Sequence, residues 1–246
     1  MGRLRGLARA GLERSGMGRA VEGFDLPDAV CLTYDDGPDP RGTRTVLGQL
    51  AERGATATFF VMANRVRRHP EVLQEVLRAG HEVALHGPDH RDLSADGPVR
   101  VRRLVLDARA EVEDVAGRGV TWFRPPYVAL RLDGWVALRG TGLRFAASGA
   151  AIRDWQTELD DARRVALLRA DLSPGDVVLA HDSWAGEDDH TRRGREPVLD
   201  RGWLCARALD IFAERGLRTL TLSGAAAEGA ARTATRAALR RGASSW

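Results

Sequence analysis

The chain alternates between short apolar runs and longer stretches in which apolar side chains recur every three or four residues. The longest of these stretches covers residues 101–115, and its spacing predicts a helix with one buried face. Shorter stretches of the same kind occupy residues 46–50, 72–77 and 204–212. The apolar runs between them predict buried strands, so the pattern indicates an α/β protein.

A glycine separates most of the predicted helices from the strand that follows. Glycine just past the last helical turn supplies the left-handed residue that ends a helix. The predicted strands cover residues 29–32, 56–61, 82–85, 120–123, 143–146, 177–180 and 217–222. Helix, glycine and strand in repeated order are typical of βα units with parallel strands. We therefore expect a distorted (β/α) barrel with about seven parallel strands, closed or nearly closed.

A length of 246 residues suits one large domain with a substantial core. We assign residues 28–222 to this domain. Residues 1–27 form an Arg-rich N-terminal extension, and residues 223–246 form an Ala- and Arg-rich C-terminal tail. Both ends are interpreted as tails or loosely docked helices.

Charge and composition argue against several classes of function. The net charge is only +3, and the arginines are spread along the chain, so no nucleic-acid surface is indicated. Cys31 and Cys205 are too few for a disulfide framework and are interpreted as core residues. Residues 1–20 lack the apolar segment of a secretory signal and no transmembrane segment is found, so we expect a cytoplasmic location. The Arg-rich amino end allows weak peripheral contact with an anionic membrane.

Two adjacent carboxylates, Asp35 and Asp36, stand at the end of the first predicted strand. Side by side they repel each other, unless a cation separates their roles. The Gly-Pro that follows predicts a sharp exit from the strand. The pair therefore predicts a metal on one carboxylate and a free base on the other.

His86 and His90 follow the strand predicted at residues 82–85. Gly-Pro between them makes a helix unfavourable and predicts a tight loop that brings both imidazoles to one point. Two histidines and one carboxylate leave open positions for water, as catalytic metal sites do. The alternative is a pair of surface histidines in an ordinary loop.

Further polar clusters also follow predicted strands, at Arg124 to Tyr127 and at His181. In βα barrels the loops at the carboxyl ends of the strands form the active site. Four reactive clusters at the same rim favour an enzyme over a structural protein.

These clusters resemble the polysaccharide deacetylase family, the NodB-homology enzymes of carbohydrate esterase family 4. The matching motifs are residues 33–37 (TYDDG), 86–90 (HGPDH), 124–127 (RPPY), 154–155 (DW) and 179–181 (LAH). They appear in the family's order. The resemblance covers most of residues 28–222 and implies a NodB-like barrel.

The resemblance also implies roles around a metal ion. Asp36, His86 and His90 would hold a divalent cation, usually zinc, cobalt or nickel in the family, and zinc is the first expectation here. Asp35 would be the general base that takes a proton from a water activated by the metal. Arg124 would pair with Asp35 and keep it ionised.

On the leaving-group side, the resemblance implies that His181 is the general acid and that Asp154 tunes it. The backbone N–H of Tyr127 would help to hold the oxyanion. Leu179 and Trp155 would form the wall of the pocket for the acetyl methyl group.

Some positions depart from the family pattern. Gly87 stands where most members have Ser or Thr, which removes a hydroxyl that braces the histidine loop. Ala151 stands where a longer form of the fourth motif carries another Asp. Residues 182–197 are predicted as a charged, solvated loop, so Trp184 and His190 are not counted as groove residues.

The expected function is removal of the acetyl group from an N-acetylated amino sugar in an oligosaccharide, a glycoconjugate precursor or a sugar metabolite. Two alternatives stay open. One is a different metal enzyme with a 2-His-1-carboxylate site, such as an iron oxygenase. The other is a catalytically silent carbohydrate-binding homologue.

Overall fold

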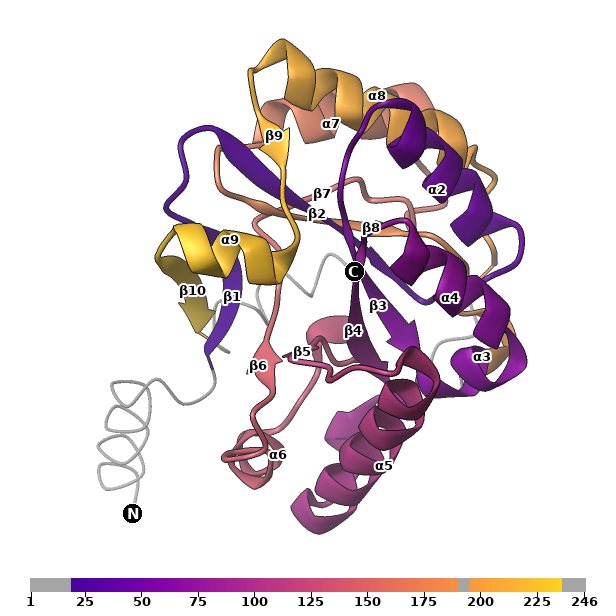
Figure 1. Ribbon diagram of the computed structural model, residues 1–246, viewed down its shortest axis with the longest axis vertical. Coiled ribbons are helices and arrows are strands. Elements are labelled where there is room, and N and C mark those ends of the chain that lie inside the picture. The colour runs from indigo at the N-terminus through magenta and orange to yellow at the C-terminus, as the bar shows by residue number, and fades with distance from the viewer. Residues whose placement is uncertain (1–18, 190–194, 236–246) are drawn as a thin grey trace.

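The computed structural model describes residues 19–189 and 195–235. A curled sheet of parallel strands forms its centre, in the order β6-β5-β4-β3-β2-β8-β7, with β9 beside the start of β2. Helices surround this sheet (Figure 1). The expected distorted (β/α) barrel is confirmed.

The bounds of the elements agree closely with the pattern of apolar residues. The strands of the curled sheet are β2 (Ala29–Asp35), β3 (Thr58–Met62), β4 (Glu82–Gly87), β5 (Trp122–Phe123), β6 (Arg144–Phe145), β7 (Ala150–Ala151), β8 (Val177–His181) and β9 (Arg218–Thr219). The helices in the described residues are α2 (Gly42–Glu52), α3 (Ala63–Arg68), α4 (Pro70–Arg78), α5 (Pro98–Ala116), α6 (Leu132–Ala137), α7 (Asp161–Asp171), α8 (Arg201–Glu214) and α9 (Leu222–Glu228). Every predicted strand is present in at least shortened form. The sequence missed β7, because two alanines make no apolar run.

Strand β2 lies in the middle of the sheet, and all of its residues are buried. Leu32 and Tyr34 belong to the larger core cluster, which packs against the helices. Because side chains alternate along a strand, Thr33 and Asp35 project to the other face, into the barrel. There both accept hydrogen bonds from Arg124. The period of two in β2 therefore directs Asp35 to the inside of the barrel.

The two ends of the described chain differ from the expected tails and loosely docked helices. β1 (Arg19–Phe24) pairs antiparallel with β10 (Ala231–Thr235). Phe24 is fully buried, and its ring packs edge-on against Trp122 at a centroid distance of 6.4 Å. The interpretation as tails is therefore wrong for these two segments. Each forms a strand by pairing with the other, and no local sequence pattern reveals a partner so far away in the chain. Residues 1–18 and 236–246 lie outside the described residues.

Two expectations from composition can be compared with the structure. Cys31 and Cys205 are buried and unpaired, as expected for core residues. The described part of the chain contains no helix with the length and apolar character needed to cross a membrane.

Gly175 provides a test of the contact between β1 and the turn that precedes β8. It has φ +80°, and a Cβ there would stand 1.9 Å from the backbone oxygen of Phe24. We expect Gly175→Ala to lower the free energy of unfolding by about 1–2 kcal/mol for the left-handed backbone and a further ~1–3 kcal/mol for the clash. Gly216→Ala is the matched control, since Gly216 has φ +67° and open space around it. Equal losses for both variants in urea unfolding would contradict the clash.

Candidate active site

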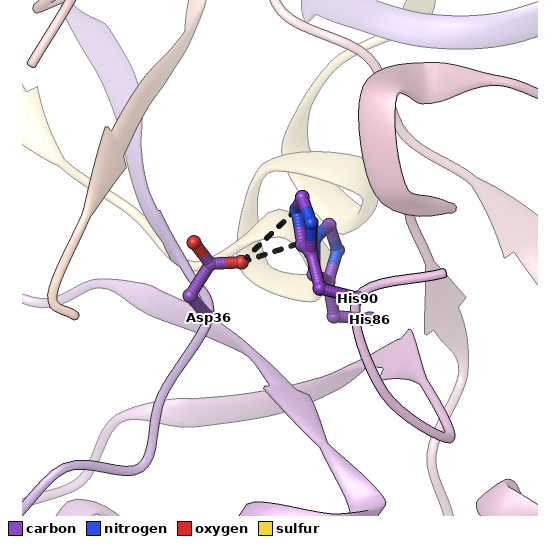
Figure 2. Close-up of side chains that lie close together, drawn as sticks. All are labelled: Asp36, His86 and His90. Atoms are coloured by element: carbon purple, nitrogen blue, oxygen red, sulfur yellow. Dashed lines mark ion pairs between the residues drawn. The ribbon is translucent and has the colours of Figure 1, made fainter. Parts of the chain in front are cut away.

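Asp36, His86 and His90 converge at the carboxyl ends of β2 and β4, as the sequence predicts (Figure 2). The Nε2 atoms of His86 and His90 lie 3.4 Å and 3.5 Å from Oδ1 of Asp36. One possible ligand atom from each residue lies within 4.8 Å of the other two. All three side chains are buried, and Oδ1 of Asp36 has no hydrogen-bond partner. One carboxylate oxygen and two imidazole nitrogens fit a divalent cation.

The backbone around these ligands explains why the motif contains glycines. Asp36 itself has φ +79°, so the chain turns sharply at the end of β2. A Cβ on Gly37 would stand 2.3 Å from Oδ2 of Asp182, whose carboxylate packs against this turn. Asp182 is buried, and burial raises its pKa to about 7. It accepts a hydrogen bond from the Thr43 hydroxyl, which agrees with a structural role.

Asp35 and Arg124 form a buried ion pair next to the cluster. Nη1 of Arg124 donates to Oδ1 of Asp35 at 2.7 Å and to Oγ1 of Thr33 at 3.0 Å. Nη2 donates to the backbone oxygen of Ala147 at 2.8 Å, and the guanidinium lies 4.2 Å from the ring centroid of Phe60. Burial lowers the pKa of Arg124, and Asp35 opposes this shift. The contacts fix the orientation of the Asp35 carboxylate.

His181 and Asp154 form the second pair. Nδ1 of His181 lies 2.7 Å from Oδ1 of Asp154, and the backbone N–H of His181 donates to Oδ2 at 2.7 Å. Burial by itself would lower the pKa of His181, but Asp154 and then Asp36 and Asp35 raise it to about 9. In the parallel register of β2 and β8, His181 is the partner of Asp35. A carboxylate and a protonated imidazole therefore stand on neighbouring strands beside the metal ligands.

A pocket of about 260 Å³ opens over these groups. Tyr127, Leu179 and Trp155 are among the residues that line it. Tyr127 has φ +58° at the centre of a short 3-10 helix, and its ring packs edge-on against His90 at 4.7 Å. The ring of Trp155 packs edge-on against His181 at 5.5 Å.

The segment after β8 differs from the expected solvated loop. Ser183, Trp184, Ala185 and Asp189 line the pocket, and so does Arg201 at the start of α8. The segment through Asp189 is held by side chains of α3, which precedes it by more than a hundred positions. No motif near these residues could have revealed this contact. His190 lies outside the described residues.

Comparison with known proteins agrees with this geometry. The profile of the polysaccharide deacetylase family matches residues 25–146. The chitooligosaccharide deacetylase of Sinorhizobium fredii is 37% identical over 155 residues, which are 63% of this chain and 72% of that relative.

Two solved structures show a similar fold. The peptidoglycan deacetylase PdaC from Bacillus subtilis has a TM-score of 0.67 and 23% identity, over 82% of this chain and 91% of that chain. A CE4 family pseudoenzyme from Bacillus anthracis has a TM-score of 0.71 and 16% identity, over 82% and 66% of the two chains. The 37% identity to a relative covered to 72% of its length, together with the profile match, shows that this chain belongs to the polysaccharide deacetylase family.

Proposed function

We propose that this protein is a metal-dependent hydrolase that removes the acetyl group from an N-acetylated amino sugar. The observation that carries the proposal is the buried cluster of Asp36, His86 and His90, flanked by the Asp35–Arg124 pair and the His181–Asp154 pair. The name of the Sinorhizobium relative, a chitooligosaccharide deacetylase, supports this substrate class.

Asp36, His86 and His90 would hold the divalent cation, for which zinc is our first choice and cobalt or nickel are alternatives. Two nitrogen ligands and one oxygen ligand suit these borderline metals better than magnesium or calcium. When bound, such a cation makes a water molecule more acidic and polarises the carbonyl of the amide.

Amide hydrolysis also needs a base for the attacking water and a proton for the amine that leaves. We assign the base to Asp35, whose carboxylate Arg124 orients inside the barrel. We assign the acid to His181, because its raised pKa keeps the imidazole protonated at neutral pH. The two groups are register partners on adjacent strands, and both line the pocket in which we place the substrate amide.

The remaining pocket residues are assigned to substrate binding. The backbone N–H of Tyr127 would stabilise the negative charge that develops on the carbonyl oxygen. Leu179 and Trp155 offer an apolar wall for the acetyl methyl group. We propose oligosaccharides, glycoconjugate precursors or sugar metabolites as substrates, and a cytoplasmic location for the reaction.

Acetate release tests the proposal directly. Purified protein is stripped with a chelator, reloaded with zinc, cobalt or nickel, and incubated with N-acetylglucosamine and its oligomers of increasing length. We expect acetate only with a metal present. Binding of the sugars without acetate release would instead indicate a silent carbohydrate-binding homologue. Oxygen consumption with iron and 2-oxoglutarate would indicate an oxygenase, although the Asp35 and His181 pairs have no function in that chemistry.

Substitution of Asp154 is expected to change the pH profile of kcat. Asp154 is the main group that raises the pKa of His181, so Asp154→Asn lowers that pKa and the alkaline limb moves to lower pH. A bound cation repels the imidazolium, so the alkaline limbs of the wild type and of Asp154→Asn are both expected below pH 9 in the metal-loaded enzyme. The profile is measured as acetate release between pH 5 and about 10. An alkaline limb that does not move in Asp154→Asn would remove His181 from the role of acid.

A further inference from the structure

The two histidines of the cluster differ in what holds the ring nitrogen that faces away from Asp36. Nδ1 of His86 lies 2.8 Å from the backbone oxygen of Arg124. Nδ1 of His90 makes no hydrogen bond within the described residues but faces the carboxylate of Asp189 as an ion pair, with 3.5 Å between Nδ1 and Oδ2. Histidines that bind metals almost always donate this second N–H to a carboxylate or a carbonyl, which fixes the ring and raises its basicity.

The loop that carries His90 does not itself supply an acceptor for the Nδ1–H group of His90. Gly87, the last residue of β4, has no side chain, and its φ is +134°. Pro88 has no N–H. The carboxylate of Asp89 is bound by Arg91, with 2.6 Å between Nε and Oδ1. The group that faces Nδ1 of His90 therefore comes from a different part of the chain.

Asp189 is held in place by its neighbour Asp188. The carboxylate of Asp188 accepts hydrogen bonds from three side chains of α3: Asn64 at 2.6 Å, Arg65 at 2.9 Å and Arg68 at 2.6 Å. The Arg65 guanidinium also donates to the backbone oxygens of Trp184 at 2.6 Å and Ala185 at 3.2 Å. Asp188 and Arg65 each have only 12% of the side chain exposed, so these contacts are shielded from water.

Helix α3 also holds the histidine loop. The backbone N–H of Asn64 donates to the oxygen of Pro88 at 3.0 Å, between the two histidines. One short helix thus binds the loop that carries His90 and the segment that carries Asp189. This fixes the distance between the two residues.

We infer that Asp189 is a positioning residue for the metal site: its carboxylate holds the His90 imidazole through Nδ1, so that Nε2 points toward Asp36. The contacts of Asp188 with α3 keep Asp189 in place. The inference rests on the proposed function, because it concerns the same metal site. Asp189 is expected to affect metal affinity first, and acetate release only through it.

Metal affinity measured without substrate tests this inference. The dissociation constants of Zn²⁺ and Co²⁺ are measured by competition with a chromogenic chelator for the wild type, Asp189→Ala, Asp189→Asn and the control Asp28→Asn. Asp28 is exposed, precedes β2 at its far end and pairs with Arg218. We expect Asp189→Ala to weaken binding by about 10- to 100-fold. Asp189→Asn should lose less, because its amide oxygen can still accept the Nδ1–H. Asp28→Asn should bind as the wild type does.

The same samples separate this role from a purely structural one. The melting temperature of the metal-free variants should stay near that of the wild type, while the absorption bands of the Co²⁺-loaded Asp189→Ala protein should shift. Wild-type affinity in both Asp189 variants would overturn the inference. If metal affinity falls as expected but no amino sugar releases acetate, the inference stands and the proposed function fails.

A second substitution tests the contact with α3. Arg65→Gln breaks the contact with Asp188, so it should weaken metal binding in the wild-type background. In the Asp189→Ala background it should have little further effect, because the carboxylate that it positions is absent. Additive losses in the double variant would show that Arg65 does not act through Asp189.

Discussion

Asp36→Ala is expected to remove metal binding and, with it, nearly all acetate release. Oδ1 of Asp36 is the atom on which both histidines converge, and it is buried without a hydrogen-bond partner. A divalent cation contributes several kcal/mol to the stabilisation of the transition state, so its loss lowers kcat/KM by about 10³-fold or more. Acetate release and metal content are measured on the same preparation.

The surface variant Asp28→Ala is the control for Asp36→Ala and should behave as the wild type does. Asp36→Ala also removes a buried charge, so the folding of Asp36→Ala is checked by circular dichroism. Full metal content in a folded Asp36→Ala protein would contradict the assignment of this residue as a ligand.

Asp35→Asn is expected to give the opposite combination, with metal retained and catalysis lost. The substitution keeps the size of the side chain and a hydrogen-bond acceptor for Arg124, but it removes the group that takes the proton. A positioned general base contributes about 10²- to 10⁴-fold, and kcat should fall within that range. Single-turnover acetate release, with metal content measured in parallel, shows whether the step lost is chemical.

Asp35→Asn is also expected to destabilise the fold, because Arg124 is buried. Without the Asp35 carboxylate, the guanidinium of Arg124 loses its ionic partner. Breaking a buried ion pair lowers the free energy of unfolding by about 3–5 kcal/mol. The bonds to Thr33 and Ala147 remain, so the loss for Asp35→Asn should lie at or below that range. Activity of Asp35→Asn within tenfold of the wild type would assign the base to another group. Two adjacent carboxylates thus yield opposite outcomes in metal content.

The likeness to a pseudoenzyme from Bacillus anthracis gives these variants their purpose. A shared fold at 16% identity does not secure activity. The variants Asp36→Ala and Asp35→Asn test the particular side chains on which activity depends, because they separate metal binding from proton transfer.

Much of the fold and the site could be predicted because the signals are local. The apolar run of β2 is followed directly by two aspartates. The length of such a run and its composition are enough to predict a strand without knowledge of its neighbours. The Gly-Pro between His86 and His90 likewise reveals a tight loop without any knowledge of its surroundings. Since the carboxyl ends of parallel strands meet at one rim, these local signals were enough to bring the three ligands together.

The remainder depends on contacts between distant segments. β1 and β10 form a sheet although neither has a clear strand pattern, because each is completed by the other. Asp189 belongs to a charged stretch that reads as solvated. Only the docking of Asp188 on α3 buries it and directs it to His90. Such pairs have no signature within a single window of sequence.

The order of the strands has a consequence for biosynthesis. Asp36, His86 and His90 all lie between the end of β2 and the loop after β4, whereas His181 ends β8. A nascent chain that has emerged from the ribosome through the loop after β4 already contains the three ligands, while the acid is still to be translated. Because domains generally fold as units, and β8 pairs with β2 while Asp189 faces His90, the complete metal site is expected to form only after β8 and Asp189 have also emerged.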